Sequence, residues 1–273
     1  MTPARFAYAR PATLEAALAI LAAQGEDAAP LAGGQSLMPM LALRVARPAL
    51  LLDLNRIAGL DAITLENEVL RIGALARHAA VLTHPLVAAE APLLALALHH
   101  VAHPAIRNRG TLGGSLALAD PAAELPACML ALDATIVLAC TFGVRRVKAS
   151  TFFTGIYATV RRADELLVAV EIPRAPGWTP WFAEVSRRHG DYAMAGLAMM
   201  RSRAALRLAF FGVEAAPRRL PTVEAALLAG TVALPDGLLD PLDSPEAPAA
   251  YRLHLARRLL ARAAAEDAAH AAA

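Results

Sequence analysis

Two glycine pairs with hydroxyl side chains beside them lie eighty positions apart in this chain, and any fold must give both a role. The first is in residues 33–36, Gly-Gly-Gln-Ser, and the second is in residues 111–115, Thr-Leu-Gly-Gly-Ser. Because glycine has no Cβ, such a pair lets the backbone approach a ligand closely and present successive N–H groups to an anion. A single pair is more often an ordinary turn. Two pairs with matching flanks favour a ligand such as a diphosphate.

Other recognisable chemistry is missing from the sequence. Neither glycine segment has the Gly-x-Gly-x-x-Gly spacing of a Rossmann site, and no Gly-Lys-Ser/Thr forms a nucleotide-triphosphate loop. No nucleophile elbow or His-Glu-x-x-His motif supports a hydrolase. His99 and His103 could share a helix face, but they lack the three or four ligands of a usual metal site. We therefore predict no catalytic residue and no metal site in this chain.

Composition limits the partners and the location. The 273 residues can bury a real core, and the formal net charge of +2 is too small to indicate a nucleic-acid surface. Charge, Gly or Pro interrupts each apolar run before the ~20 residues that a membrane-spanning helix needs. The first six residues lack the basic and apolar pattern of a secretory signal. We expect a cytoplasmic protein with no nucleic-acid partner and no membrane span.

The chain has only two cysteines, Cys128 and Cys140. An all-cysteine iron–sulfur cluster takes four thiolates, so this chain cannot hold one. Free cysteines in apolar segments are usually inert core residues, and we expect that of both. If electrons reach this chain from an iron–sulfur cluster, another chain carries the cluster.

Hydrophobic periodicity predicts helices and strands in irregular succession. Thr13 can cap a helix whose apolar residues recur at helical spacing up to Gly25. Strands or hairpins are predicted at 50–54, 63–72, 166–172, 181–185, 193–200 and 204–211, and further helices at 93–103, 125–132, 222–229 and 252–265. The irregular order favours an α+β fold over a doubly wound sheet. Residues 173–177, rich in Pro and Gly, are typical of a linker between domains.

Longer stretches around the glycine pairs resemble a known family. They are residues 30–37, Pro-Leu-Ala-Gly-Gly-Gln-Ser-Leu, and 107–116, Arg-Asn-Arg-Gly-Thr-Leu-Gly-Gly-Ser-Leu, running on into 119–126, Ala-Asp-Pro-Ala-Ala-Glu-Leu-Pro. Together with 6–11, Phe-Ala-Tyr-Ala-Arg-Pro, and 190–193, Gly-Asp-Tyr-Ala, they resemble the FAD-binding medium subunits of carbon monoxide dehydrogenase and related xanthine dehydrogenase-family enzymes. The resemblance extends over essentially the whole chain.

The resemblance implies an architecture. A two-lobed FAD-binding domain of the PCMH type would occupy residues 1–174, with the boundary between its lobes near 55–60. A small C-terminal domain would occupy residues 175–273. The strands predicted there give it a three-stranded antiparallel sheet with helices.

The resemblance also implies FAD contacts from two loops and three other segments. In the family the two glycine loops cradle FAD together, the first largely at the diphosphate. The loop residues are Ala32, Gly33, Gly34, Gln35, Ser36, Leu37, Thr111, Gly113, Gly114 and Ser115. An acidic residue near the ribityl chain would be Glu124, with Asp120 as an alternative, because carboxylates accept hydroxyl protons well. Tyr192 and Leu167, or its neighbour Leu166, would lie near the isoalloxazine.

Two positions depart from the family pattern. Ser115 stands where Asn is frequent, and Gln35 stands where carbon monoxide dehydrogenase itself has His. Both residues keep a hydrogen-bonding side chain, so FAD binding is expected to survive. The departures argue against assigning this chain to carbon monoxide dehydrogenase in particular.

The function implied is electron transfer within a molybdenum hydroxylase. In the family, a large molybdopterin subunit oxidises the substrate, a small subunit holds two [2Fe-2S] clusters, and the FAD of the medium subunit passes electrons to NAD, quinone or another acceptor. The complex is usually a dimer of heterotrimers. The branch resembling 4-hydroxybenzoyl-CoA reductase needs extra cysteines that this chain lacks. Two alternatives stay open: a self-contained FAD oxidase and a scaffold subunit without flavin.

Overall fold

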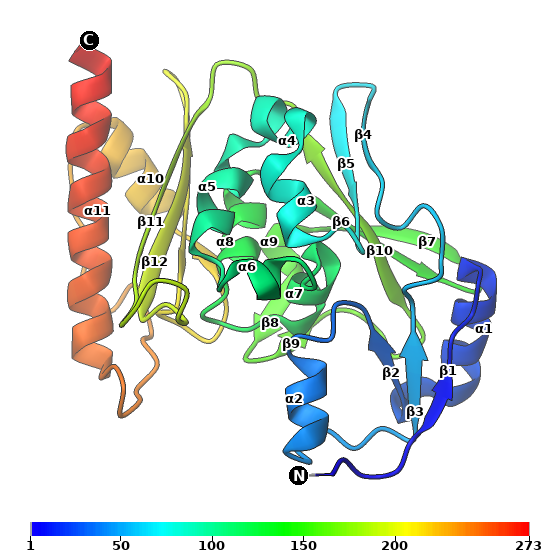
Figure 1. Ribbon diagram of the computed structural model, residues 1–273. Helices are drawn as coiled ribbons and strands as arrows, with labels where there is room; N and C mark the ends of the chain where they lie inside the picture. Colours follow the sequence, from blue (N-terminus) through cyan, green and yellow to red (C-terminus); the bar gives the residue numbers. More distant parts are fainter. Residues whose placement is uncertain (1, 273) are drawn as a thin grey trace.

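The computed structural model describes residues 2–272, and this part of the chain has the predicted α+β fold (Figure 1). A parallel three-stranded sheet comes first, then an antiparallel five-stranded sheet, then an antiparallel four-stranded sheet. A short ladder also pairs β8 (Phe153–Gly155) with β9 (Ala158–Thr159). No helix among the described residues is both long and apolar enough to cross a membrane.

The first sheet has the strand order β1-β3-β2. Its elements are β1 (Ala7–Ala9), α1 (Leu14–Gln24), the 3-10 turn η1 (Gly25–Asp27), β2 (Ala28–Leu31), α2 (Leu37–Ala42) and β3 (Leu50–Asp53). The predicted cap of α1 is confirmed, since the Thr13 hydroxyl accepts from the Ala16 N–H at 3.2 Å. Ala17, Leu18 and Leu21 bury the apolar face of α1 in the core of this lobe.

The second sheet has the strand order β4-β5-β10-β6-β7. Its strands are β4 (Ile63–Glu66), β5 (Val69–Gly73), β6 (Thr135–Cys140), β7 (Gly143–Lys148) and β10 (Leu166–Pro173). The helices of this region are α3 (His78–Thr83), α4 (Pro85–Glu90), α5 (Pro92–His100), α6 (Pro104–Arg107), α7 (Leu112–Leu118), α8 (Glu124–Ala131) and α9 (Ala149–Phe152). The predicted hairpin at 63–72 is confirmed as β4 and β5, with Asn67 and Glu68 in the left-handed region at its turn.

The helix predicted at 93–103 is shorter than expected. It ends at His100, and the residue Ala102 takes a left-handed φ of 45°, which a continuing helix does not allow. Pro104 then starts α6 as a separate short helix. The prediction was wrong at this end because apolar periodicity alone does not reveal a chain reversal.

The C-terminal region corrects a second prediction. Its sheet contains β11 (Thr179–Val185), β12 (Ala195–Arg201) and β13 (Leu206–Phe211), but also a fourth strand, β14 (Arg218–Arg219), paired with Ala209 and Phe210. A two-residue strand of arginines has no apolar alternation, so sequence pattern could not predict it. The helices of this region are α10 (Pro221–Leu228) and α11 (Ala249–Ala272).

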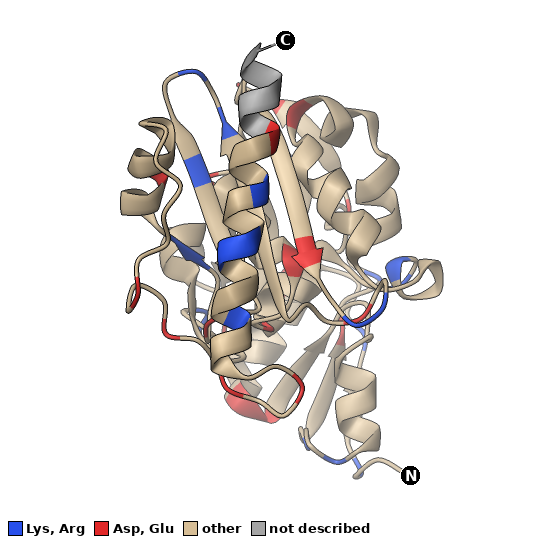
Figure 2. Cartoon of the chain, turned by 90° about the vertical axis from the view of Figure 1, so that its left-hand side faces the viewer, with Lys and Arg blue, Asp and Glu red and all other residues tan. Residues whose placement is uncertain are grey.

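Alternate residues of β12 enter two different cores. Ala198 and Met200 belong to the core shared with α5 and α8, whereas Leu197 and Met199 belong to the core under α10 and α11. The sheet is therefore covered on both faces, which explains its nearly continuous apolar sequence (Figure 1). Seen from the side of α11, the positions of basic and acidic residues are scattered along the chain between longer uncharged stretches (Figure 2).

Candidate cofactor-binding site

One large cavity, of about 1110 Å³, lies where the three sheets and their loops meet. This volume is slightly above the ~300–1,000 Å³ typical of small-molecule and cofactor sites. All fourteen residues that the sequence singled out line it, and they are Ala32, Gly33, Gly34, Gln35, Ser36, Leu37, Thr111, Gly113, Gly114, Ser115, Asp120, Glu124, Leu167 and Tyr192. Segments more than 150 positions apart in the sequence thus share one concave surface.

The first loop, residues 32–37, offers a row of free donors. Within the described chain, no hydrogen bond engages the backbone N–H groups of residues 33–36. Gly34 holds a left-handed φ of 75°, and the Gln35 side-chain amide donates to the Gly33 carbonyl at 3.2 Å, which stabilises the turn. Successive backbone N–H groups in such a turn form a concave anion site. The geometry of the first loop suits a diphosphate.

In the second loop, residues 111–115, the backbone N–H groups of residues 112–115 already have partners within the protein. The N–H of Leu112 donates to Ala76 at 3.0 Å, and that of Gly113 donates to Ala74 at 2.8 Å. The Gly114 N–H donates to the Thr111 hydroxyl at 3.1 Å, which caps α7. We expected both loops to present backbone donors, and for the second loop this is wrong. The second loop instead forms part of the cavity wall and supplies the side-chain hydroxyls of Thr111 and Ser115.

The glycines themselves are required mainly by contacts within the protein. A Cβ on Gly33 would lie 2.2 Å from the carbonyl oxygen of Arg109, so the first loop packs against the backbone just before the second loop. A Cβ on Gly113 would lie 2.5 Å from the Cβ of Ala74. Both distances are far below van der Waals contact. Close packing against Arg109 and Ala74, besides access for a ligand, explains these two glycines.

Two acidic residues form one wall of the cavity. The carboxylate of Asp120 accepts from the Ala122 N–H at 2.9 Å and from the Tyr157 hydroxyl at 3.3 Å. Glu124 begins α8, and its burial, followed by the negative charge of Glu184, raises its pKa to about 8. A pKa near 8 favours the protonated form of Glu124 at neutral pH, and that form can donate a hydrogen bond as well as accept one.

Leu167 and Tyr192 line the cavity from different segments of the chain. Leu167 is a buried residue of β10, and Leu166 beside it also lines the cavity. Tyr192 lies between β11 and β12 and is 68% exposed. Tyr157, 60% exposed, lines the cavity as well, although sequence reasoning missed it because no motif surrounds it. The cavity mouth thus carries two exposed aromatic side chains.

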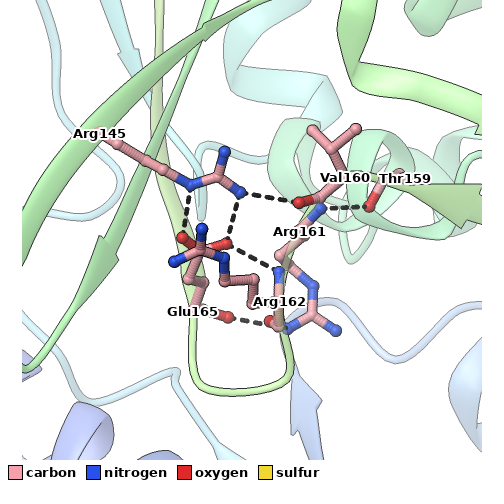
Figure 3. A network of polar contacts seen from close by, with 6 residues as sticks. All are labelled: Arg145, Thr159, Val160, Arg161, Arg162 and Glu165. Atoms are coloured by element: carbon pink, nitrogen blue, oxygen red, sulfur yellow. Dashed lines mark hydrogen bonds and ion pairs between the residues drawn. The ribbon is translucent and has the colours of Figure 1, made fainter.

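A polar network fixes the cavity wall next to β10 (Figure 3). Arg145 binds both carboxylate oxygens of Glu165, at 2.5 and 2.8 Å, and donates to the Val160 carbonyl at 2.7 Å. Arg161 lines the cavity and donates to the carbonyls of Arg162 and Glu165 at 2.9 and 2.8 Å. Sequence reasoning missed Arg161 and Glu165. The ion pair of Glu165 with Arg145 forms because Arg145 lies on β7 and Glu165 directly precedes β10, in the same sheet.

Other polar groups near the second loop and α5 have partners within the protein. Arg107 donates to the carbonyls of Val101 and Ala102, both at 2.8 Å. His100 lies 3.4 Å from Glu184, and no group of three or more possible metal ligands occurs among the described residues. Cys128 is fully buried, and burial raises the pKa of its thiol well above the ordinary value. A thiol in that state is unreactive.

Two family models match the chain. The first, the FAD binding domain in molybdopterin dehydrogenase, matches residues 4–175. The second, the CO dehydrogenase flavoprotein C-terminal domain, matches residues 181–267. Together they account for nearly the whole sequence.

Known proteins with these domains are similar over most of their length. The 6-hydroxypseudooxynicotine dehydrogenase complex subunit alpha of Paenarthrobacter nicotinovorans is 45% identical over 199 residues, covering 72% of this chain and 67% of that protein. The carbon monoxide dehydrogenase medium chain of Afipia carboxidovorans is 34% identical over 278 residues, covering 96% of each.

Solved structures show the same fold. A chain of carbon monoxide dehydrogenase from Oligotropha carboxidovorans superposes with a TM-score of 0.92 at 33% identity, covering 96% of this chain and 97% of that one. A chain of quinoline 2-oxidoreductase from Pseudomonas putida 86 gives 0.87 at 37% identity, covering 97% and 98%. Fold and cavity thus define the flavoprotein subunit of an oxidoreductase, with an FAD-binding domain.

Within that class, the chain belongs to the family of FAD-binding medium subunits of the carbon monoxide dehydrogenase and xanthine dehydrogenase type, the molybdenum hydroxylases.

Proposed function

We propose that this chain binds one FAD in the large cavity, with the diphosphate on the first loop. The unpartnered N–H groups of residues 33–36 carry this proposal, because they need an acceptor and lie at the wall of a cavity large enough for a dinucleotide. Ser115 and Thr111 complete that end of the site from the second loop. Bound FAD supplies the electron-accepting and electron-donating chemistry, and the protein positions it.

The other predicted contacts complete the proposal. Glu124, protonated at neutral pH, and Asp120 are placed to hydrogen-bond the ribityl hydroxyls. Leu167 and Tyr192 provide apolar and aromatic surface for the isoalloxazine. Arg161, held against backbone carbonyls, brings a positive charge to the same wall. These side chains bind, orient and shield the cofactor, and none of them acts as a catalytic base.

We further propose that the chain works inside a larger complex. Its FAD would carry electrons from [2Fe-2S] clusters of a small subunit to an external acceptor, while a large molybdopterin subunit oxidises the substrate. The names of the relatives, which are subunits of dehydrogenase complexes, support this proposal. A dimer of heterotrimers in the cytoplasm is part of this proposal.

The proposed domain division agrees with the first and third of three hydrophobic cores, and the second core crosses it. Residues 1–174 would form the FAD-binding domain with its lobe boundary near 55–60, and residues 175–273 would form the C-terminal domain. One core holds α1 and β3, a second holds α5 and α8, and a third holds α11. The second core also includes residues of β12 and β13, so the two domains would share an extensive apolar contact.

Titration of the purified full chain with FAD tests the binding proposal. We expect one FAD per chain, quenched flavin fluorescence and an oxidised-flavin absorption spectrum that survives gel filtration. A chain that is folded by circular dichroism but retains no FAD, alone or with its partner subunits, would support the flavin-free scaffold alternative and contradict the proposal.

A further inference from the structure

We propose that a linked set of side chains outside the cavity, Tyr8, Asp53, Asn55 and Arg77, fixes the spacing of the two loops and so sets the affinity for FAD. We name this set the loop clamp. The inference rests on the proposed FAD site, but none of the four residues lines the large cavity. Asn55 and Arg77 border a separate cavity of about 150 Å³. They are therefore positioning residues rather than cofactor ligands.

The clamp joins one loop to the other through two side chains. The Asn55 Nδ2 donates to the Ala32 carbonyl of the first loop at 2.9 Å. The Asn55 Oδ1 accepts from the Arg77 Nη2 at 2.5 Å, and the Arg77 Nη1 donates to the Arg109 carbonyl, next to the second loop. A continuous path of hydrogen bonds thus connects the backbone just before each glycine pair.

Asp53 and Tyr8 orient the amide of Asn55. The Asp53 Oδ1 accepts from the backbone N–H of Asn55 at 2.9 Å and from its Nδ2 at 2.6 Å. The Tyr8 hydroxyl donates to the Asp53 Oδ2 at 2.5 Å, and Arg10 lies 3.2 Å from the same oxygen. Burial opposes ionisation of Asp53, but hydrogen bonds from Tyr8 and Asn55 outweigh it and lower its pKa. Tyr8 and Arg10 belong to the stretch 6–11 that resembles the family, and their contacts with Asp53 give that stretch a structural role.

The loops converge at the point that the clamp holds. The Arg109 carbonyl is packed against Gly33 on one side, where a Cβ would come within 2.2 Å, and accepts from Arg77. Without Arg77, the Arg109 carbonyl and the Asn55 Oδ1 each lose a charged donor. The first loop would then be held only by the packing of Gly33 against Arg109. The distance between the N–H groups of residues 33–36 and the opposite wall of the large cavity would no longer be fixed.

The test compares FAD dissociation constants of full-length variants by fluorescence titration. Arg77→Met and Asn55→Ala each break the path of hydrogen bonds between the loops. Arg77→Lys keeps a positively charged donor but lacks the planar guanidinium group that donates to two acceptors at once. Arg71→Met is the matched control, because Arg71 pairs with Glu171 at 2.9 Å on the second sheet and does not touch the loops. The melting temperature of each flavin-free variant is measured in parallel, and titrations are run well below the lowest one.

We expect Arg77→Met and Asn55→Ala to raise the dissociation constant about 10- to 100-fold, as loss of a supporting hydrogen bond does around other bound groups. Arg77→Lys should fall between wild type and Arg77→Met, and Arg71→Met should match wild type. The double variant, Arg77→Met with Asn55→Ala, should bind FAD no more weakly than the weaker-binding single variant, because both substitutions break the same path of hydrogen bonds. The inference is overturned if Arg77→Met binds FAD like wild type, if Arg71→Met weakens binding equally, or if the two losses add fully. No FAD binding by wild type would instead contradict the proposed function, and the clamp with it.

Discussion

Single glycines in the two loops have different physical reasons to be glycine. Gly33 and Gly113 face other parts of the protein so closely that no Cβ fits. Gly34 holds a left-handed φ of 75°, and the side chains of Leu31 and Met38 lie 3.2 Å from where its Cβ would be. The sequence locates these positions, but the reason for each appears only when the opposing backbone is known.

Gly33→Ala is therefore expected to destabilise the flavin-free protein. Its Cβ would collide with backbone near Arg109, which cannot move aside as a flexible side chain can, so we expect a loss of about 1–3 kcal/mol in the free energy of unfolding. Gly155→Ala is the control, because its Cβ would meet only Ala158 at 3.9 Å. Urea unfolding of both variants measures the difference, and equal stability of the two would refute the close approach.

Glu124 gives a prediction with a defined pH window. Its folded-state pKa of about 8 lies above its ordinary value of 4.5, so folding favours the protonated form. That contribution is complete below about pH 4.5 and is lost as the pH rises toward 8, on the order of 1.4 kcal/mol per pH unit. Glu124→Gln, which stays neutral, should match wild type near the acid end of this window and exceed its stability above about pH 8. Parallel curves of unfolding free energy against pH for the two proteins would count against a protonated Glu124.

At the level of elements, regular patterns were predictable and context-dependent ones were not. The cap and apolar stripe of α1 and the hairpin of β4 and β5 follow local rules, and the structure confirms both. The end of α5 and the strand β14 depend on a chain reversal and on a neighbouring strand, which local rules do not contain. Helices as short as α6 and α7 form in water only with tertiary support.

The second loop shows that local sequence rules are also insufficient for the site. Its glycine pair indicated a row of donors, but the N–H groups of Leu112 and Gly113 donate to Ala76 and Ala74, just after β5. Those partners are about forty positions earlier in the sequence, and nothing local announces the pairing. The location of the site was predictable from motifs. Which loop has free backbone N–H groups could be learned only from the three-dimensional arrangement.

The cap of α7 supports the second loop and can be tested directly. Thr111→Ala removes the hydroxyl that accepts from the Gly114 N–H, and we expect a loss of about 1 kcal/mol in the free energy of unfolding. Thr111→Ser keeps the acceptor and should retain most of that stability. Denaturant unfolding distinguishes them, and a Thr111→Ala variant as stable as wild type would show that the cap contributes nothing.

On the scale of the whole molecule, the cavity exists only because distant segments fold together. The first loop, α7, α8, β10 and the segment between β11 and β12 all line it. The resemblance supplied that set of residues in advance, but Tyr157, Arg161 and Glu165 became visible only in the assembled fold. No sequence motif marks these three residues, and the fold alone brings them to the cavity.

The proposed place in a complex predicts how the flavin is reduced. In the proposed complex a partner subunit oxidises the substrate, so FAD on the isolated chain should not be bleached by organic substrates of molybdenum hydroxylases, whereas FAD in the complex with both partner subunits should be bleached. Anaerobic absorption spectroscopy of the chain alone and of the complex measures this. Rapid bleaching of the lone chain by an organic substrate would favour the self-contained oxidase.

Site-resolved amide hydrogen exchange with and without FAD tests the central claim most directly. In the flavin-free chain, the N–H groups of residues 112–115 should already be protected by their internal partners, and those of residues 33–36 should exchange quickly. Addition of FAD should strongly slow exchange at residues 33–36 and change residues 112–115 little. If FAD binds and the amides of residues 33–36 continue to exchange as fast as before, the diphosphate does not lie on the first loop and the account is wrong.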